Sequence, residues 1–262
     1  MPVTIGAFNR PWTNFTLDQA LEQMAAAGYG HVGFLRQQKR LIVPEGTPQE
    51  EIERTASLVK QAGLTVDVVM TATAYDKPEE EAVSQIVEHA KNSAAIGARF
   101  LLTTGGKPEM FDAYCSIARK AAAGCAEHGV MLTVKPHGGL TMLGTDCAEV
   151  VKAVDHPNFG VFYDPGNIAY YAGVTDPADV KHCAAHVVGV CVKDCVLEPK
   201  HDVNIEPGAG VVDFVAFFKI LLDAGFEGPC VVECLGGDTK EDIFARALRT
   251  RQRLENLLKT SD

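Results

Sequence analysis

The sequence has no long apolar run and no cluster of basic residues. No stretch reaches about 18 consecutive apolar residues, so we expect no membrane-spanning segment. The opening MPVTIGAFNRPW does not place an apolar run after a basic segment, so we expect no secretory signal. The formal net charge is −10, which argues against binding to a phosphate backbone. A small polar substrate suits this charge better than a nucleic acid does.

Cysteine is also too sparse for a disulfide scaffold, at 8 residues among 262. Cys115 and Cys125 lie in helical patterns, at positions where a small apolar residue would pack. No two cysteines have the C-x-x-C spacing typical of structural zinc sites. We therefore expect reduced thiols and a cytoplasmic protein.

Short apolar segments alternate with longer amphipathic ones along the whole chain. Continuous apolar strands between helices predict a parallel sheet that helices cover. Eight such units favour a closed (β/α)8 TIM barrel formed by one domain over 1–262, and no GxGxxG follows the first strand. The open doubly wound sheet stays the rival, because periodicity does not give strand order. The expected strands are 3–8, 31–35, 65–71, 99–104, 131–135, 159–164, 187–193 and 229–234, and the expected helices are 16–28, 48–63, 78–97, 109–128, 145–154, 176–185, 211–224 and 238–259.

Charged side chains gather where the last four expected strands end, and in a barrel the carboxyl ends of the strands carry the active site. Lys135 ends the fifth strand and His137 follows it. Asp164, Lys193 and Glu233 end the sixth, seventh and eighth strands. When carboxylates, an ammonium and an imidazole lie close together away from water, each group shifts the pKa of the others. Acid–base chemistry requires such shifted pKa values.

Several further residues are expected to shape the substrate pocket. The loop 195–210 is the longest irregular segment, and long loops at the catalytic face often act as lids. Lys193 and Asp194 are expected to pair at the end of the seventh strand. The residues predicted to contact substrate are Arg36, Tyr163, Asn167, Lys193 and Gly208.

Four segments, YDPGN (163–167), VKD (192–194), PGAGVVDF (207–214) and VVE (231–233), together resemble the sugar phosphate isomerase/epimerase family, the xylose isomerase-like TIM barrels. The resemblance runs from the first strand to the last helix. It implies a divalent metal (Mn, Mg or Zn) held by Glu, Asp, His and Glu on the last four strands, with the glutamates moving protons beside a sugar carbonyl. By position, Asp164 matches the sixth-strand ligand, and Glu233 matches the eighth-strand ligand and base.

Two positions depart from that family pattern. Lys135 stands where the fifth-strand Glu is expected, and Cys191 stands where the seventh-strand His is expected. One alternative is that His137 joins Asp164 and Glu233, with or without Cys191, in a rebuilt metal site. A second is that the Lys135 ammonium takes the metal's place and polarises a carbonyl. A third is that Lys135 forms a Schiff base with a keto-sugar. In a purely structural alternative, Lys135 only neutralises the two carboxylates.

The resemblance predicts a sugar isomerase or epimerase that transfers a proton beside a carbonyl, with Glu233, Lys135 and His137 as catalytic residues. A lyase or dehydratase acting on a keto-sugar or inositol derivative is the enzymatic alternative, because the same enediolate can expel a β-hydroxyl. A non-catalytic sugar-binding barrel with a degenerate metal site is the alternative outside enzymes. We expect a small carbohydrate ligand and no nucleic-acid or membrane partner, and the sequence leaves a homo-oligomer open.

Overall fold

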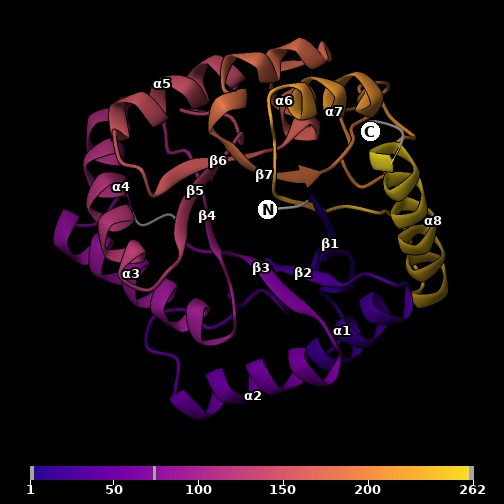
Figure 1. Cartoon of the computed structure of the whole chain (residues 1–262), viewed down its shortest axis with the longest axis horizontal. Helices are drawn as coiled ribbons and strands as arrows, with labels where there is room; N and C mark the ends of the chain where they lie inside the picture. Colours follow the sequence, from indigo (N-terminus) through magenta and orange to yellow (C-terminus); the bar gives the residue numbers. More distant parts are fainter. Residues whose placement is uncertain (1–2, 73–74, 260–262) are drawn as a thin grey trace.

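The computed structural model describes residues 3–72 and 75–259. Eight parallel strands pair in sequence order and form a closed barrel (Figure 1). The closure is made where Thr4 to Ala7 pair with Pro229 to Val232. This confirms the predicted (β/α)8 barrel and excludes the open sheet. The strands are β1 (Thr4–Phe8), β2 (His31–Phe34), β3 (Thr65–Met70), β4 (Phe100–Thr104), β5 (Met131–Lys135), β6 (Phe159–Tyr163), β7 (Val187–Val192) and β8 (Pro229–Val232).

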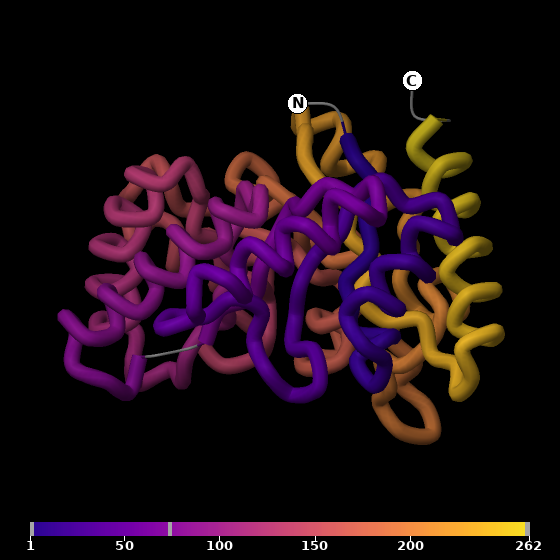
Figure 2. Tube along the Cα trace, turned by 90° about the horizontal axis from the view of Figure 1, so that it is seen from below, coloured from indigo at the N-terminus to yellow at the C-terminus, as the bar shows by residue number. Residues whose placement is uncertain are grey.

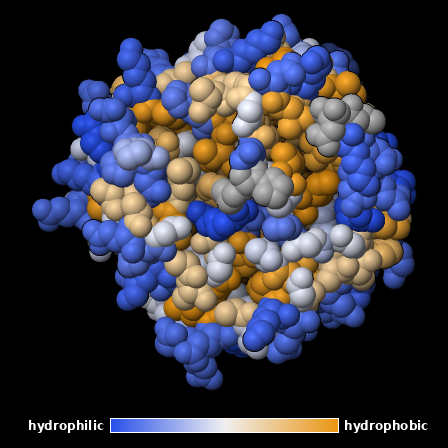
Figure 3. Space-filling model, viewed as in Figure 1, coloured by the Kyte–Doolittle hydropathy of each residue, from blue (hydrophilic) through white to orange (hydrophobic). Residues whose placement is uncertain are grey.

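The helices surround the barrel. Hydrophilic side chains cover much of their outer surface, and apolar side chains lie nearer the barrel (Figure 3), as amphipathic helices predict. None of the described helices is long and apolar enough to cross a bilayer. The α-helices are α1 (Leu17–Ala26), α2 (Gln49–Gln61), α3 (Glu79–Ala95), α4 (Phe111–Ala126), α5 (Gly144–Val154), α6 (Pro165–Ala172), α7 (Phe214–Asp223) and α8 (Lys240–Lys259), and the 3₁₀ helices are η1 (Arg10–Trp12), η2 (Pro108–Met110), η3 (Pro177–His182) and η4 (Ala184–His186).

The segment between β6 and β7 differs from the prediction. The expected helix at 176–185 is two short 3₁₀ helices, while the α-helix α6 begins directly after β6. Asp164 caps α6, because its Oδ1 accepts a hydrogen bond from the backbone N–H of Asn167 at 2.9 Å, and Pro165 supplies a first-turn residue that needs no N–H partner. The early start of α6 places Asn167 beside the end of β6.

A small apolar cluster fills the barrel interior below the carboxyl ends of the strands, and it forms the floor beneath the side chains that lie at those ends. Phe162 lies at its centre, with ring centroids 6.4 Å from Phe8 and 6.1 Å from Phe100. Gly189 makes room for it, because a Cβ there would lie 2.2 Å from the Phe162 ring. Cys191 belongs to the same cluster and is fully buried. The strand residues that face inward are therefore fixed by packing, and so are the residues two positions further along each strand.

The loop between β2 and α2 is fastened to α3 by a buried histidine. His89 contacts the carbonyl oxygen of Ile42 through Nε2 at 2.8 Å and the hydroxyl of Thr71 through Nδ1 at 2.9 Å. Burial lowers the pKa of His89 to about 4. The imidazole is therefore neutral at pH 7, with Nε2–H donating to Ile42 and Nδ1 accepting from Thr71.

The long loop after β7 extends from the end of the barrel opposite the two termini (Figure 2). The buried carboxylate of Asp194 holds both ends of this loop. Its Oδ1 accepts from the N–H groups of Cys195 at 2.8 Å and Val212 at 3.0 Å, and its Oδ2 accepts from those of Gly208 and Gly210 at 2.8 Å. Asp194 is thus committed to the loop, and the expected pair with its neighbour Lys193 is not formed.

The neutral state of His89 predicts a pH-dependent stability. His89 takes up a proton near pH 6.5 in the unfolded chain but only near pH 4 in the folded chain. The contribution of neutral His89 to the free energy of unfolding is therefore fully present above pH 6.5 and is lost as the pH falls toward 4. We expect urea unfolding to show the stability advantage of the wild type over His89→Gln shrinking by about 2–3 kcal/mol between pH 7 and pH 4.5. Parallel pH profiles for the two proteins would contradict this assignment.

The loop anchor predicts a large difference between two aspartates. Asp194→Ala leaves four N–H groups without their acceptor and should lower the free energy of unfolding by about 3 kcal/mol or more. The matched control is Asp213→Ala, which removes one exposed cap on the N–H of Ala216 and should cost about 1 kcal/mol. Chemical denaturation measures both values, and equal losses would show that Asp194 does not anchor the loop.

Candidate active site

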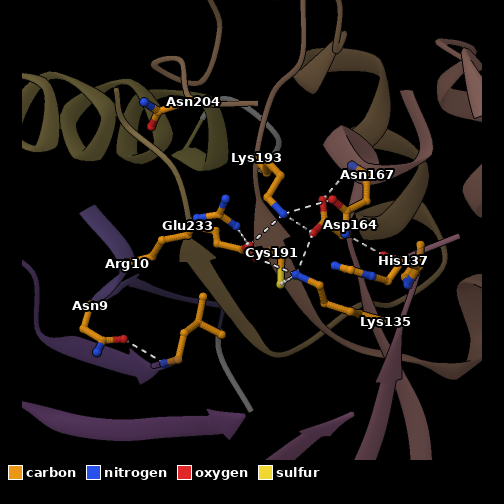
Figure 4. Close-up of polar contacts among 12 residues, drawn as sticks. Asn9, Arg10, Lys135, His137, Asp164, Asn167, Cys191, Lys193, Asn204 and Glu233 are labelled. Carbon is orange, nitrogen blue, oxygen red and sulfur yellow. Dashed lines mark hydrogen bonds and ion pairs between the residues drawn. The ribbon is translucent and has the colours of Figure 1, made fainter. Parts of the chain in front are cut away.

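Four charged side chains meet at the carboxyl ends of the last four strands. Lys135 is the last residue of β5, and Asp164, Lys193 and Glu233 directly follow β6, β7 and β8. They point toward one another above the apolar floor (Figure 4). Each is at most 2% exposed. We call these four residues the charge quartet.

Each ammonium group of the charge quartet binds both carboxylates. The Lys135 Nζ lies 3.0 Å from Asp164 Oδ2 and 2.7 Å from Glu233 Oε2. The Lys193 Nζ lies 3.0 Å from Asp164 Oδ2 and 2.7 Å from Glu233 Oε1. Arg10, at the start of η1, adds a third cation 2.9 Å from Glu233 Oε1. Three cations and two carboxylates leave the site with one net positive charge in a chain of net charge −10.

The ion pairs fix the ionisation of these groups. Burial alone would raise the pKa of Glu233, but Lys135, Lys193 and Arg10 together hold it well below its usual range. Burial alone would lower the pKa of Lys135 and of Lys193, but the neighbouring acidic groups raise both values. The two lysines are therefore ammonium ions at neutral pH. A Schiff base at Lys135 would first require the loss of a strongly held proton.

Asn167 positions the charge quartet. Its side-chain Nδ2 donates to the carbonyl of Pro136 at 2.7 Å, and its Oδ1 accepts from Lys193 Nζ at 3.0 Å. The predicted substrate contact through its amide thus competes with two hydrogen bonds that link the start of α6 to the ends of β5 and β7.

His137 lies beside the charge quartet but outside its ion pairs (Figure 4). Its imidazole is exposed, and its nitrogens lie 3.4 and 3.5 Å from the hydroxyl of Tyr171. Partial desolvation at the rim, together with the charges of Lys135 and Lys193, lowers the pKa of His137. A neutral imidazole with weakly engaged nitrogens can accept a proton at neutral pH.

Three of the residues expected to contact substrate lie away from the charge quartet. Tyr163 points outward from β6: its hydroxyl donates to Asp179 at 2.7 Å and its ring stacks on Phe217. Arg36 is exposed and lines a separate cavity of about 690 Å³ between the β2–α2 loop and helices α1 and α2. The N–H of Gly208 is bound by Asp194.

Arg10 is the site residue that the sequence prediction left out. It follows β1, and β1 lies next to β8 only because the barrel closes. A signal was present, since Arg10 is a charged residue two positions after an apolar strand. Its contact with Glu233 spans 223 positions of sequence.

The residues present do not fit a divalent metal ion. Asp164, Cys191 and Glu233 bring one ligand atom each within 4.8 Å of one another. The Lys135 ammonium already lies among them, 3.9 Å from the Cys191 sulfur and within 3.0 Å of both carboxylates. Burial raises the pKa of Cys191 well above its usual value, so its sulfur keeps its proton and is a poor ligand. His137 is not part of this group of ligand atoms.

Two curated relatives match parts of the chain. The inosose dehydratase of Erwinia tasmaniensis is 32% identical over 161 residues, which are 54% of this chain and 52% of that protein. The L-ribulose-5-phosphate 3-epimerase of Shigella boydii is 31% identical over 98 residues, which are 37% of this chain and 33% of that protein. The matches thus span about half and about a third of these relatives.

The fold and the family are matched over almost the whole chain. A solved xylose isomerase-like TIM barrel protein from Mycobacterium smegmatis in complex with magnesium superposes with a TM-score of 0.79 at 14% identity, covering 98% of this chain and 97% of that one. At this identity the likeness concerns the fold. A family model described as xylose isomerase-like TIM barrel matches residues 21–257. The chain therefore belongs to the xylose isomerase-like TIM barrel family.

Proposed function

We propose that the protein is a sugar isomerase or epimerase that moves a proton on the carbon beside a carbonyl group. The observation that carries the proposal is the charge quartet, a desolvated set of ammonium groups and carboxylates at the catalytic end of the barrel. Relatives named as a 3-epimerase and a dehydratase support a reaction through an enediolate. The substrate is a small keto- or aldo-sugar or a derivative of one.

Lys135 is the group that stabilises the charge formed in the reaction. All three protons of the Lys193 ammonium have oxygen partners within 3.0 Å, namely Asp164, Glu233 and Asn167. Lys135 has two such partners, and its third contact is the Cys191 sulfur at 3.9 Å. Lys135 thus has one N–H group without an oxygen acceptor among the described residues, and this N–H group donates a hydrogen bond to the substrate carbonyl oxygen. A hydrogen-bond donor that points at the oxygen where negative charge develops lowers the activation free energy of the reaction, and the effect is larger in a buried site.

His137 and Glu233 move the proton. The neutral imidazole of His137 takes the proton from the carbon beside the carbonyl, the C–H electron pair forms the enediol double bond, and the carbonyl electron pair moves to oxygen. Return of the proton to the neighbouring carbon, with transfer of the hydroxyl proton to the former carbonyl oxygen, isomerises the sugar. Delivery of a proton to the opposite face of the same carbon inverts it. We assign the opposite face to Glu233, which is ionised in the free site and takes up a proton from solvent before it delivers one to the carbon, while the imidazolium of His137 releases its proton to solvent.

Metal assistance, which the family resemblance implies, is not part of this mechanism, because the donor set does not fit a divalent ion. A dehydratase is the second candidate, favoured by the match to an inosose dehydratase. It would use the same enediolate, which expels a β-hydroxyl as water. The two candidates differ in product rather than in site.

The proposal predicts exchange between substrate and solvent. Incubation in D2O with a panel of keto-sugars, free and phosphorylated, should place deuterium on the carbon beside the carbonyl, as NMR would detect. His137→Gln should slow this exchange by about 10²–10⁴-fold, and Lys135→Met by about 10²–10³-fold. His182→Gln, an exposed residue in η3, is the control and should exchange at the wild-type rate.

Two outcomes would change the assignment. Loss of water from the labelled sugar would replace the isomerase by the dehydratase. Sugar binding without exchange across the panel would favour the non-catalytic sugar-binding barrel.

A further inference from the structure

We propose that the ammonium pair of Lys135 and Lys193 replaces the divalent metal of the family pattern, so that the site is built and works without a metal ion. The catalytic half of this inference rests on the proposed function. The binding half, that no metal enters the site, does not depend on any activity.

The first argument is that all four carboxylate oxygens are already bound by N–H donors. Asp164 Oδ1 accepts from the backbone of Asn167, and Asp164 Oδ2 accepts from both lysines. Glu233 Oε1 accepts from Arg10 and Lys193, and Glu233 Oε2 accepts from Lys135. The space between the two carboxylates is thus occupied by ammonium groups, and a metal ion that bridged both carboxylates there would displace an ammonium from them.

The second argument is charge. The two ammonium groups carry the same formal charge as one divalent ion, and they lie between the same two carboxylates that the family pattern assigns to the metal. Arg10 already brings the site to one net positive charge. A divalent ion that displaced one ammonium would still be repelled at short range by the other ammonium and by Arg10.

The third argument is that the lysines are held in place by the fold. Lys193 packs against the start of α6, because a Cβ on Gly166 would lie 2.7 Å from the Lys193 side chain. Asn167 accepts from the Lys193 ammonium at 3.0 Å. Lys135 is 2% exposed and ends a strand whose preceding inward residues are packed. Swinging either lysine out to admit a metal would therefore disrupt the barrel rim.

The consequence for the reaction is that the Lys135 N–H group stabilises the negative charge on the substrate oxygen, as a metal ion would do in the family pattern. The enediolate oxygen accepts a hydrogen bond from the ammonium, and no electron or proton is gained or lost overall in the isomerisation. The site should therefore be insensitive to chelators.

The experiment uses the full chain, produced in medium with added Mn2+ and Zn2+ and purified without chelator. We expect elemental analysis to find far less than one metal ion per chain. Thermal unfolding should shift by less than about 1 °C when MnCl2, ZnCl2 or EDTA is added. Stoichiometric metal that is lost in Asp164→Ala would overturn the inference.

A gain of metal binding provides the sharper test. Lys135→Glu removes one ammonium and adds a carboxylate at the family's ligand position, so Mn2+ should raise its melting temperature by about 5 °C or more. Lys152→Glu, at an exposed position of α5, makes the same charge change and should show no Mn2+ effect. An Mn2+ response of the wild type as large as that expected for Lys135→Glu would contradict the inference, and the wild-type measurement decides alone if the variant does not fold.

The two proposals fail separately. Metal-free wild type without deuterium exchange would overturn the proposed function and support the metal-free site. Exchange that EDTA abolishes and Mn2+ restores would support the function and overturn the metal-free site.

Discussion

The rim of the barrel depends on the mutual neutralisation of two buried carboxylates and two buried ammonium groups. None of the four could be buried alone, because an unpaired charge in a protein interior is strongly destabilising. Removing one partner of a buried pair typically costs about 3–5 kcal/mol, since the other charge stays without compensation. The charge quartet is therefore a constraint on stability as well as the feature on which the chemistry depends, and its members cannot be varied independently.

The fold brings these charges together through packing below and capping beside them. Phe162 and the glycine opposite it, Gly189, fill the barrel interior and fix which residues face inward. The two oxygens of Asp164 have different roles: Oδ1 caps helix α6, and Oδ2 binds the ammonium groups of both lysines. The same helix start supplies Asn167, so a short segment after β6 organises half of the site.

Much of this arrangement could be predicted from the sequence, because strand alternation is a local property. Lys135, Asp164 and Glu233 were expected at the rim from their positions at strand ends, and the structure places them there. The same alternation indicates that Tyr163, next to the inward Asp164, faces out, and its use as a substrate contact overlooked that rule. The signal for Arg10 was weaker, because it lies two residues past its strand and meets Glu233 only through the closure of the barrel.

The chemistry of the rim was harder to predict than its location. The sequence left a metal site, an ammonium site and a Schiff base open, since the choice depends on which atoms touch. In the structure Lys193 turns to the carboxylates, whereas Asp194 turns to the loop that follows it. Two adjacent charged residues thus have separate tasks, one in the site and one in holding the loop after β7. The helix α6 was missed because it is short and begins without an intervening loop.

The central claim is that ammonium nitrogens occupy the space between the carboxylates of Asp164 and Glu233. A crystal structure of the wild type grown with Mn2+ and measured at the manganese absorption edge would test it most directly. The account predicts no anomalous peak at the barrel mouth, with the Nζ atoms of Lys135 and Lys193 each within hydrogen-bond distance of both carboxylates. A manganese peak bound by Asp164 and Glu233, with either lysine turned away, would contradict it.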